Sequence, residues 1–156
     1  MTNGPVMRRT RWTDLVVPFL VVGFTSYALL RFSYHPYLQL RYFAPVPLAA
    51  LAVVEFVAAR RVRAVLRHDP SAKPMAAIVI ARCVALGKAS SIVGSGVAGA
   101  AAGMIVRLLP DVRTVDVAQH DTTVGALLFA AAVFLVVGGL LLERAGIDPN
   151  RDRHAP

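Results

Sequence analysis

The feature that most constrains this chain is an unbroken apolar run from Thr122 to Leu142, which contains no charged residue. An α-helix of about 20 such residues rises about 30 Å, which is the thickness of the hydrocarbon core of a bilayer. In a soluble protein, a run this long and this apolar would need a very large core around it. A chain of 156 residues cannot build one. The run therefore predicts a transmembrane helix.

Three other apolar stretches extend this interpretation to the whole chain. Hydrophobic residues make up 56% of the sequence and the mean hydropathy is +0.59, too apolar for an ordinary soluble domain. We expect spans at about 13–33, 42–59, 87–109 and 122–142. The predicted fold is all-α, a single polytopic membrane domain over 1–156 with four transmembrane helices. A signal peptide cleaved near Ser26-Tyr27-Ala28 is the alternative for the first span, but cleavage there would cut a continuing apolar run.

The second and third spans are less uniform than the others. The second carries Glu55 inside it and Pro45 and Pro47 near its outer end, so it is the weakest on hydropathy. The third lies in a run from Met75 to Leu109 that would measure about 52 Å as one helix, well over the hydrocarbon thickness. We therefore expect a cytoplasmic basic segment over 60–86 before this span, and a disordered charged tail over 145–156.

The positive charges predict the orientation. Lys and Arg residues number 13 on one side of the predicted spans and 4 on the other. Because the cytoplasmic side carries the excess, both termini are predicted to be cytoplasmic. The side with 4 holds Arg31, Arg41, Arg107 and Arg113.

The net charge is +8 and the pI about 10.8, and the basic residues lie beside the apolar spans, a placement that favours anionic lipid headgroups as the partner. The basic segments lack interleaved aromatics that could stack on bases, which argues against a nucleic-acid partner. After the second span, Val62, Val65 and Leu66 lie on one side of a continued helix and arginines on the other. We expect these arginines to contact anionic headgroups: they are Arg60, Arg61, Arg63 and Arg67.

Glu55 is an acidic residue inside a predicted transmembrane span, a position that needs a physical explanation. It lies about five residues inside the Arg60 boundary, roughly 7 Å into the hydrocarbon, where a charge costs a few kcal/mol. If the second and third spans are antiparallel neighbours, Lys88 pairs with it, and Arg82 is the second candidate. A structural pair is favoured over ion or proton transport. Asp14, at the start of the first helix, is interpreted as a cap.

Small residues recur every four positions in the third span and predict close helix packing. They are Gly87, Ser91, Ser95, Gly99 and Gly103. The partner is either another helix of the same chain, for which Gly138-Gly139 is available, or another subunit; the sequence leaves both open.

Motifs that would indicate catalysis are missing from the sequence. No phosphate-binding glycine loop, nucleophile elbow or zinc helix is found. The predicted outer loop holds Asp111, Asp116, His120 and Asp121, but their spacing matches no known metal loop. Cys83 is the only cysteine, so it forms no intramolecular disulfide and is expected to be a small buried hydrophobe. We expect no catalytic residue, metal or cofactor.

Three short segments together resemble a known family. They are Arg-Thr-Arg-Trp-Thr-Asp at 9–14, the stretch from Val54-Glu55 to Arg63, and Ala-Leu-Gly-Lys-Ala-Ser at 85–90. In order and spacing they resemble the actinobacterial membrane family Domain of Unknown Function 3180, over roughly Arg9 to Asp148. The resemblance implies a four-helix protein of the bacterial cytoplasmic membrane with no assigned activity, and it supplies no catalytic residues.

The functional expectation follows from size, packing and lack of motifs. We expect a non-enzymatic accessory, assembly or stabilising subunit of a larger membrane complex, with a protein partner or a homo-oligomer contacting the small-residue face. The alternative is a small oligomeric ion or solute transporter that uses Glu55. A lipid-modifying enzyme that holds a headgroup at the arginines lacks a convincing nucleophile.

Overall fold

The computed structural model describes residues 10–32, 43–67, 75–112 and 116–146, and the regular structure in these residues is helical. The long helices are α1 (Trp12–Phe32), α2 (Val46–Leu66), α3 (Ala77–Leu108) and α4 (Asp116–Ala145). A short 3-10 helix, η1 (Leu109–Asp111), follows α3. The prediction of an all-α fold with four long helices is confirmed.

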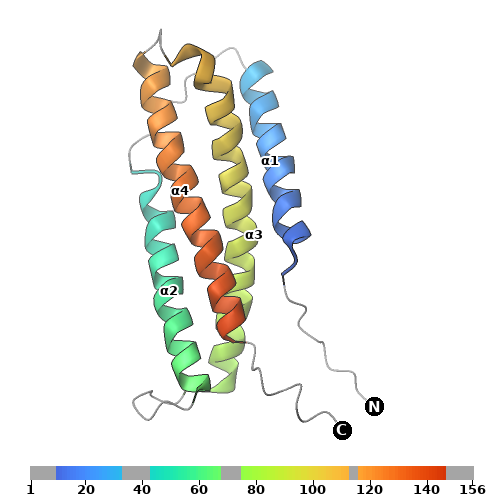
Figure 1. The fold of residues 1–156 in the computed structure, drawn as a ribbon, viewed down its shortest axis with the longest axis vertical. Helices are drawn as coiled ribbons and strands as arrows, with labels where there is room; N and C mark the ends of the chain where they lie inside the picture. Colours follow the sequence, from blue (N-terminus) through green and yellow to red (C-terminus); the bar gives the residue numbers. More distant parts are fainter. Residues whose placement is uncertain (1–9, 33–42, 68–74, 113–115, 147–156) are drawn as a thin grey trace.

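The helices pack in the order α2, α4, α3, α1 (Figure 1). Helices α1 and α3 run in one direction, and α2 and α4 run in the other. One end of the molecule therefore holds the start of α1, the end of α2, the start of α3 and the end of α4. The condition for a pair between Glu55 and Lys88, that the second and third helices are neighbours, is met only marginally, because α2 packs along α4 and makes few contacts with α3.

Three of the four helices, α1, α3 and most of α4, are long and apolar enough to cross a membrane. Helix α2 does not meet this criterion, since arginines occupy its last two turns. The four spans expected from the sequence are thus reduced to three candidates. At 1.5 Å per residue, the 32 residues of α3 measure about 48 Å, so this helix extends beyond the hydrocarbon core.

The helix boundaries differ from the expected ones at two places. The basic segment 60–86 is divided, since its first residues complete α2 and its last belong to α3, which includes Arg82 and Lys88. The outer loop is shorter than expected because α4 begins at Asp116, an acidic residue in the first turn that suits the helix dipole. The tail beyond residue 146 lies outside the described residues.

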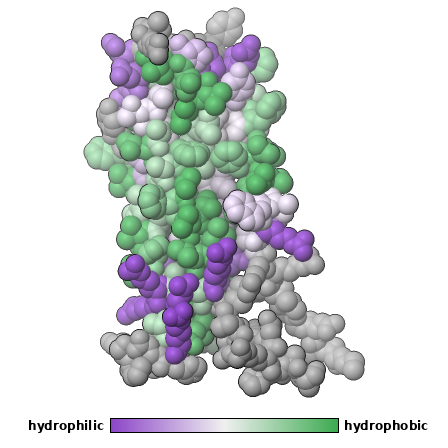
Figure 2. All heavy atoms as spheres, viewed as in Figure 1, coloured by the Kyte–Doolittle hydropathy of each residue, from purple (hydrophilic) through white to green (hydrophobic). Residues whose placement is uncertain are grey.

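The surface has the distribution expected in lipid. Figure 2 shows a mainly hydrophobic middle, with hydrophilic side chains towards the two ends. Helix α1 has no buried residue, and Phe24 in its middle is 75% exposed. An apolar helix left this open to the surroundings is stable where those surroundings are acyl chains. The chain is built as a membrane protein.

Candidate functional site

The carboxyl group of Glu55 is fully buried where α2 meets α4, with 0% of the residue exposed. Gly138 of α4 makes room for it, because a Cβ there would lie 3.4 Å from Glu55 Oε2 and 3.2 Å from the carbonyl oxygen of Ala52. Ser90 of α3 is also buried and lies beside the carboxyl group. Neither oxygen of Glu55, however, has a hydrogen-bond partner within the described residues.

The expected pair between Glu55 and Lys88 is therefore not seen as a hydrogen bond. Lys88 is half-buried and Arg82 is exposed. Both lie on α3, and the inner face of α2 is turned mainly to α4. The helix packed along this face of α2 is α4, and not α3, on which both candidate partners lie.

Gly87 and Ser91, the first members of the small-residue row in α3, pack against α4. A Cβ on Gly87 would lie 2.6 Å from the carbonyl oxygen of Gly139, and a Cβ on Gly139 would lie 3.0 Å from the backbone nitrogen of Ser91. The Ser91 hydroxyl donates to the carbonyl of Lys88 in its own helix at 2.9 Å. The two backbones thus approach as closely as glycine allows.

Gly99 and Gly103, the last members of the same row, pack against α1 instead. A Cβ on Gly99 would lie 3.0 Å from Phe19 Cα, and one on Gly103 would lie 3.2 Å from the backbone nitrogen of Tyr27. Gly23 on α1 completes this contact, since a Cβ there would lie 3.0 Å from the carbonyl oxygen of Gly99. Helices of the same chain therefore cover the small-residue face of α3. The sequence had left open whether its partner was an internal helix or another subunit.

Ser95 lies between these two contacts and is also buried. Its hydroxyl donates to the carbonyl of Ile92 at 2.7 Å. The side chain therefore satisfies itself within α3, as serine commonly does in a membrane helix.

A clasp that the sequence did not predict joins the start of the described chain to the end of α4. The backbone N–H of Thr10 donates to Glu143 Oε1 at 2.7 Å, and its hydroxyl donates to Oε2 at 2.5 Å. Glu143 is buried, so its carboxylate accepts these two hydrogen bonds in place of hydrogen bonds from water. No local sequence pattern relates residues this far apart in the chain, so the sequence alone carries no signal for this contact.

Asp14 acts as expected at the start of α1. Its Oδ2 accepts a hydrogen bond from the backbone N–H of Arg11 at 3.0 Å. Arg11 directly precedes the helix, so this is the carboxylate half of a capping box. The acidic residue also lies in the first turn, where it favours the helix dipole.

The acidic residues of the predicted outer loop lie at the other end of the molecule. Asp116, His120 and Asp121 fall on the first turns of α4, and Asp121 is buried. In the part of the chain that the structure describes, no group of three possible ligands could hold a metal ion. The side chain of Asp111 lies outside that part. Cys83 is half-buried, as a small hydrophobe would be.

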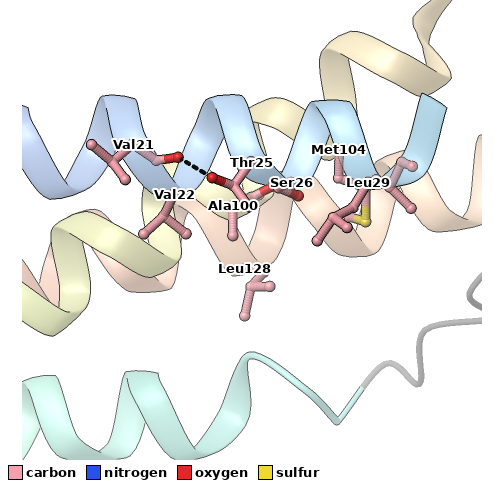
Figure 3. A pocket seen from close by; sticks show the side chains of 10 residues that line it. Val21, Val22, Thr25, Ser26, Leu29, Ala100, Met104 and Leu128 are labelled. Atoms are coloured by element: carbon pink, nitrogen blue, oxygen red, sulfur yellow. Dashed lines mark hydrogen bonds between the residues drawn. The ribbon is translucent and has the colours of Figure 1, made fainter. Parts of the chain in front are cut away.

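An apolar groove of about 560 Å³ runs between α1 and α4, with α3 as its floor (Figure 3). Val21 and Leu29 line it from α1, Ala100 from α3 and Leu128 from α4. Its two hydroxyls are used internally: Thr25 donates to the carbonyl of Val21 at 2.8 Å, and Ser26 donates to that of Ala100 at 3.1 Å. The groove thus suits an apolar occupant.

Comparison with known proteins gives a family and no function. The sequence matches the family model described as "Protein of unknown function (DUF3180)" over residues 15–149. No curated protein and no solved structure matches it. The match covers most of the chain and confirms the resemblance drawn from the three short segments. The chain belongs to the DUF3180 family.

Proposed function

We propose that this protein is a non-enzymatic accessory, assembly or stabilising subunit of a larger complex in the bacterial cytoplasmic membrane. The observation that carries the proposal is the apolar groove between α1 and α4. Among the described helices, α1 packs on α3 alone, so no helix in the described part of the chain closes one side of the groove. A transmembrane helix of a partner subunit would complete the bundle there through van der Waals packing.

The small-residue face of α3 supports this role indirectly. It was expected to be the contact with a partner, but α1 and α4 occupy it. The proposal therefore moves the partner contact to the groove, whose walls α1 and α4 pack closely on the glycines of α3.

We also propose that the chain crosses the membrane four times, with both termini in the cytoplasm. Helices α1 and α3 are both candidate spans and run in the same direction. Between them the chain has to return, and α2 runs in the returning direction. Packing along α4 would compensate for its lower hydropathy, and the excess of Lys and Arg supports a cytoplasmic position for its arginine end.

The test is purification of the tagged protein from native membranes in a mild detergent. A stoichiometric partner should be recovered. Val21→Trp with Leu29→Trp should displace it by filling the groove. The matched control is Val17→Trp with Leu20→Trp, which makes the same two side-chain changes at exposed positions of α1 outside the groove and should retain the partner. Recovery of the protein alone in several detergents would contradict the proposal.

The second candidate is a small oligomeric transporter of an ion or solute, and the buried Glu55 favours it. A carboxyl group that has no hydrogen-bond partner in the described structure is costly in a membrane protein, and such groups commonly serve ion or proton pathways. In proteoliposomes, Glu55→Gln should abolish flux while leaving the fold intact. Absence of flux in the unmodified protein for every ion tested would leave the subunit role alone.

A further inference from the structure

Helix α2 has two faces of different chemistry. The inner face, formed by Ala52, Glu55, Ala59 and Val62, is buried. Ala59 and Val62 form an apolar cluster with Leu142 of α4. The outer face is exposed along its whole length, and none of the other described helices covers it.

The outer face changes character at a single turn. Exposed positions three or four residues apart form one stripe, and its first half is apolar while its second half is basic. In order, the stripe is Val46, Ala49, Val53, Phe56, Arg60, Arg63 and Arg67. The adjacent row of Val54, Val57 and Arg61 changes from apolar to basic at the same level.

The turn at which the stripe changes contains a direct contact between the two halves. The guanidinium carbon of Arg60 lies 4.9 Å from the centroid of the Phe56 ring, within the range of a cation–π interaction. Phe56 thus extends the apolar half up to the first arginine. A stripe of this kind matches the boundary between acyl chains and headgroups.

The carboxylates of the described chain do not neutralise these arginines. Glu143 accepts from Thr10, and Asp14 accepts from the backbone of Arg11. Glu55 lies on the opposite face of α2. The acidic residues at the start of α4 lie at the other end of the molecule. Figure 2 shows hydrophilic side chains gathered at the end where α2 terminates.

We propose that this stripe binds one anionic phospholipid, with the phosphate between Arg60 and Arg63 and an acyl chain along Val53 and Phe56. Two arginines three residues apart have Cβ atoms about 5–6 Å from each other, so both guanidinium groups can reach one phosphate and hydrogen-bond it in a planar fork. The end of a helix presents carbonyls, not N–H groups. The arginine side chains therefore supply all the donors, while the apolar half selects a lipid over a soluble phosphate.

The experiment measures the thermal unfolding midpoint of the full chain in a mild detergent as lipid is added. Phosphatidylglycerol is compared with phosphatidylcholine of the same acyl chains and with glycerol phosphate, which has no acyl chain. Only phosphatidylglycerol should raise the midpoint. Each arginine near an anionic headgroup contributes roughly fivefold in affinity. Arg60→Gln with Arg63→Gln should therefore weaken the apparent affinity by roughly 30-fold.

The matched control removes two charges from the same end of the molecule but from other helices. Arg82→Gln with Arg144→Gln, both at exposed positions, should leave the affinity within about twofold of the original. If the single variant Arg63→Gln is needed because the double variant does not fold, it should lose roughly fivefold. Equal losses in the two double variants, equal effects of the two lipids, or stabilisation by glycerol phosphate would each overturn the proposal.

Discussion

Gly99 and Gly96 offer a matched pair of substitutions that tests how α1 is attached. Both glycines are buried in α3, three residues apart. A Cβ on Gly99 would overlap the carbonyl oxygen of Phe19 and lie 2.9 Å from its carbonyl carbon. A Cβ on Gly96 would lie 3.6 Å from the nearest atom, Cγ2 of Val22, an ordinary contact distance. The same change, glycine to alanine, therefore overlaps backbone at one position and makes an ordinary side-chain contact at the other.

The magnitude follows from these distances. Carbon atoms pack best at about 3.5–4.0 Å, so Gly99→Ala forces α1 away from α3 by about 0.5–1 Å. A gap of that size removes a quarter to a half of the dispersion energy at the contact, and overpacking of this kind costs about 1–3 kcal/mol. Alanine recovers about 1 kcal/mol of helix propensity. The net loss for Gly99→Ala is then about 0–2 kcal/mol, while Gly96→Ala, which gains the helix propensity without the overlap, should be neutral or stabilising.

The assay is thermal unfolding in detergent followed by circular dichroism, with both variants and the original protein measured in parallel. A difference of about 2 kcal/mol between the variants corresponds to roughly 4–8 °C in the midpoint for a chain of this size. Gly99→Ala should have the lower midpoint. If the two variants melt together within error, close backbone contact does not hold α1 to α3, and the account of the glycine row is wrong.

Three further predictions concern the clasp, the buried carboxyl group and the orientation. Glu143→Ala removes both acceptors of Thr10 and should cost about 1.5–3 kcal/mol in thermal unfolding; an unchanged midpoint would show that the clasp does not stabilise the fold. Glu55→Leu removes a buried acceptor that has no hydrogen bond in the described structure and should raise stability by about 1–3 kcal/mol, whereas a fall would indicate a compensating interaction. In a cysteine-free background, Asp116→Cys should react with an impermeant reagent on intact cells and Arg67→Cys only after permeabilisation, and the reverse pattern would overturn the orientation.

The helices could be predicted from the sequence because long apolar runs have few alternatives. The pairing of the helices could not. The glycine row illustrates why: a spacing of four residues advances about 40° beyond one full turn. Over the four steps from Gly87 to Gly103 the row therefore turns by about 160° around α3. Its first members face α4 and its last face α1, although the sequence pattern predicted one face.

The clasp between Thr10 and Glu143 was missed for a related reason. It joins an unremarkable threonine to a carboxylate at a helix end, and each has an adequate local explanation. Thr10 and Glu143 come together only because the start of α1 and the end of α4 lie at the same end of the molecule. Asp14 could be predicted correctly because its partner, Arg11, lies three residues away and the capping geometry is local.

Helix α2 combines the features that hydropathy alone does not explain. Its apolar part, from Val46 to Ala59, measures about 21 Å, short of the hydrocarbon thickness of about 30 Å. Yet the chain has to return between α1 and α3, which run in the same direction. The inner face is therefore held by α4, where Gly138 leaves room for Glu55. If packing on α4 keeps α2 in position, a bulky residue at Gly138 should displace α2. Helices α1 and α3 should remain packed, because their contact is formed by other glycines.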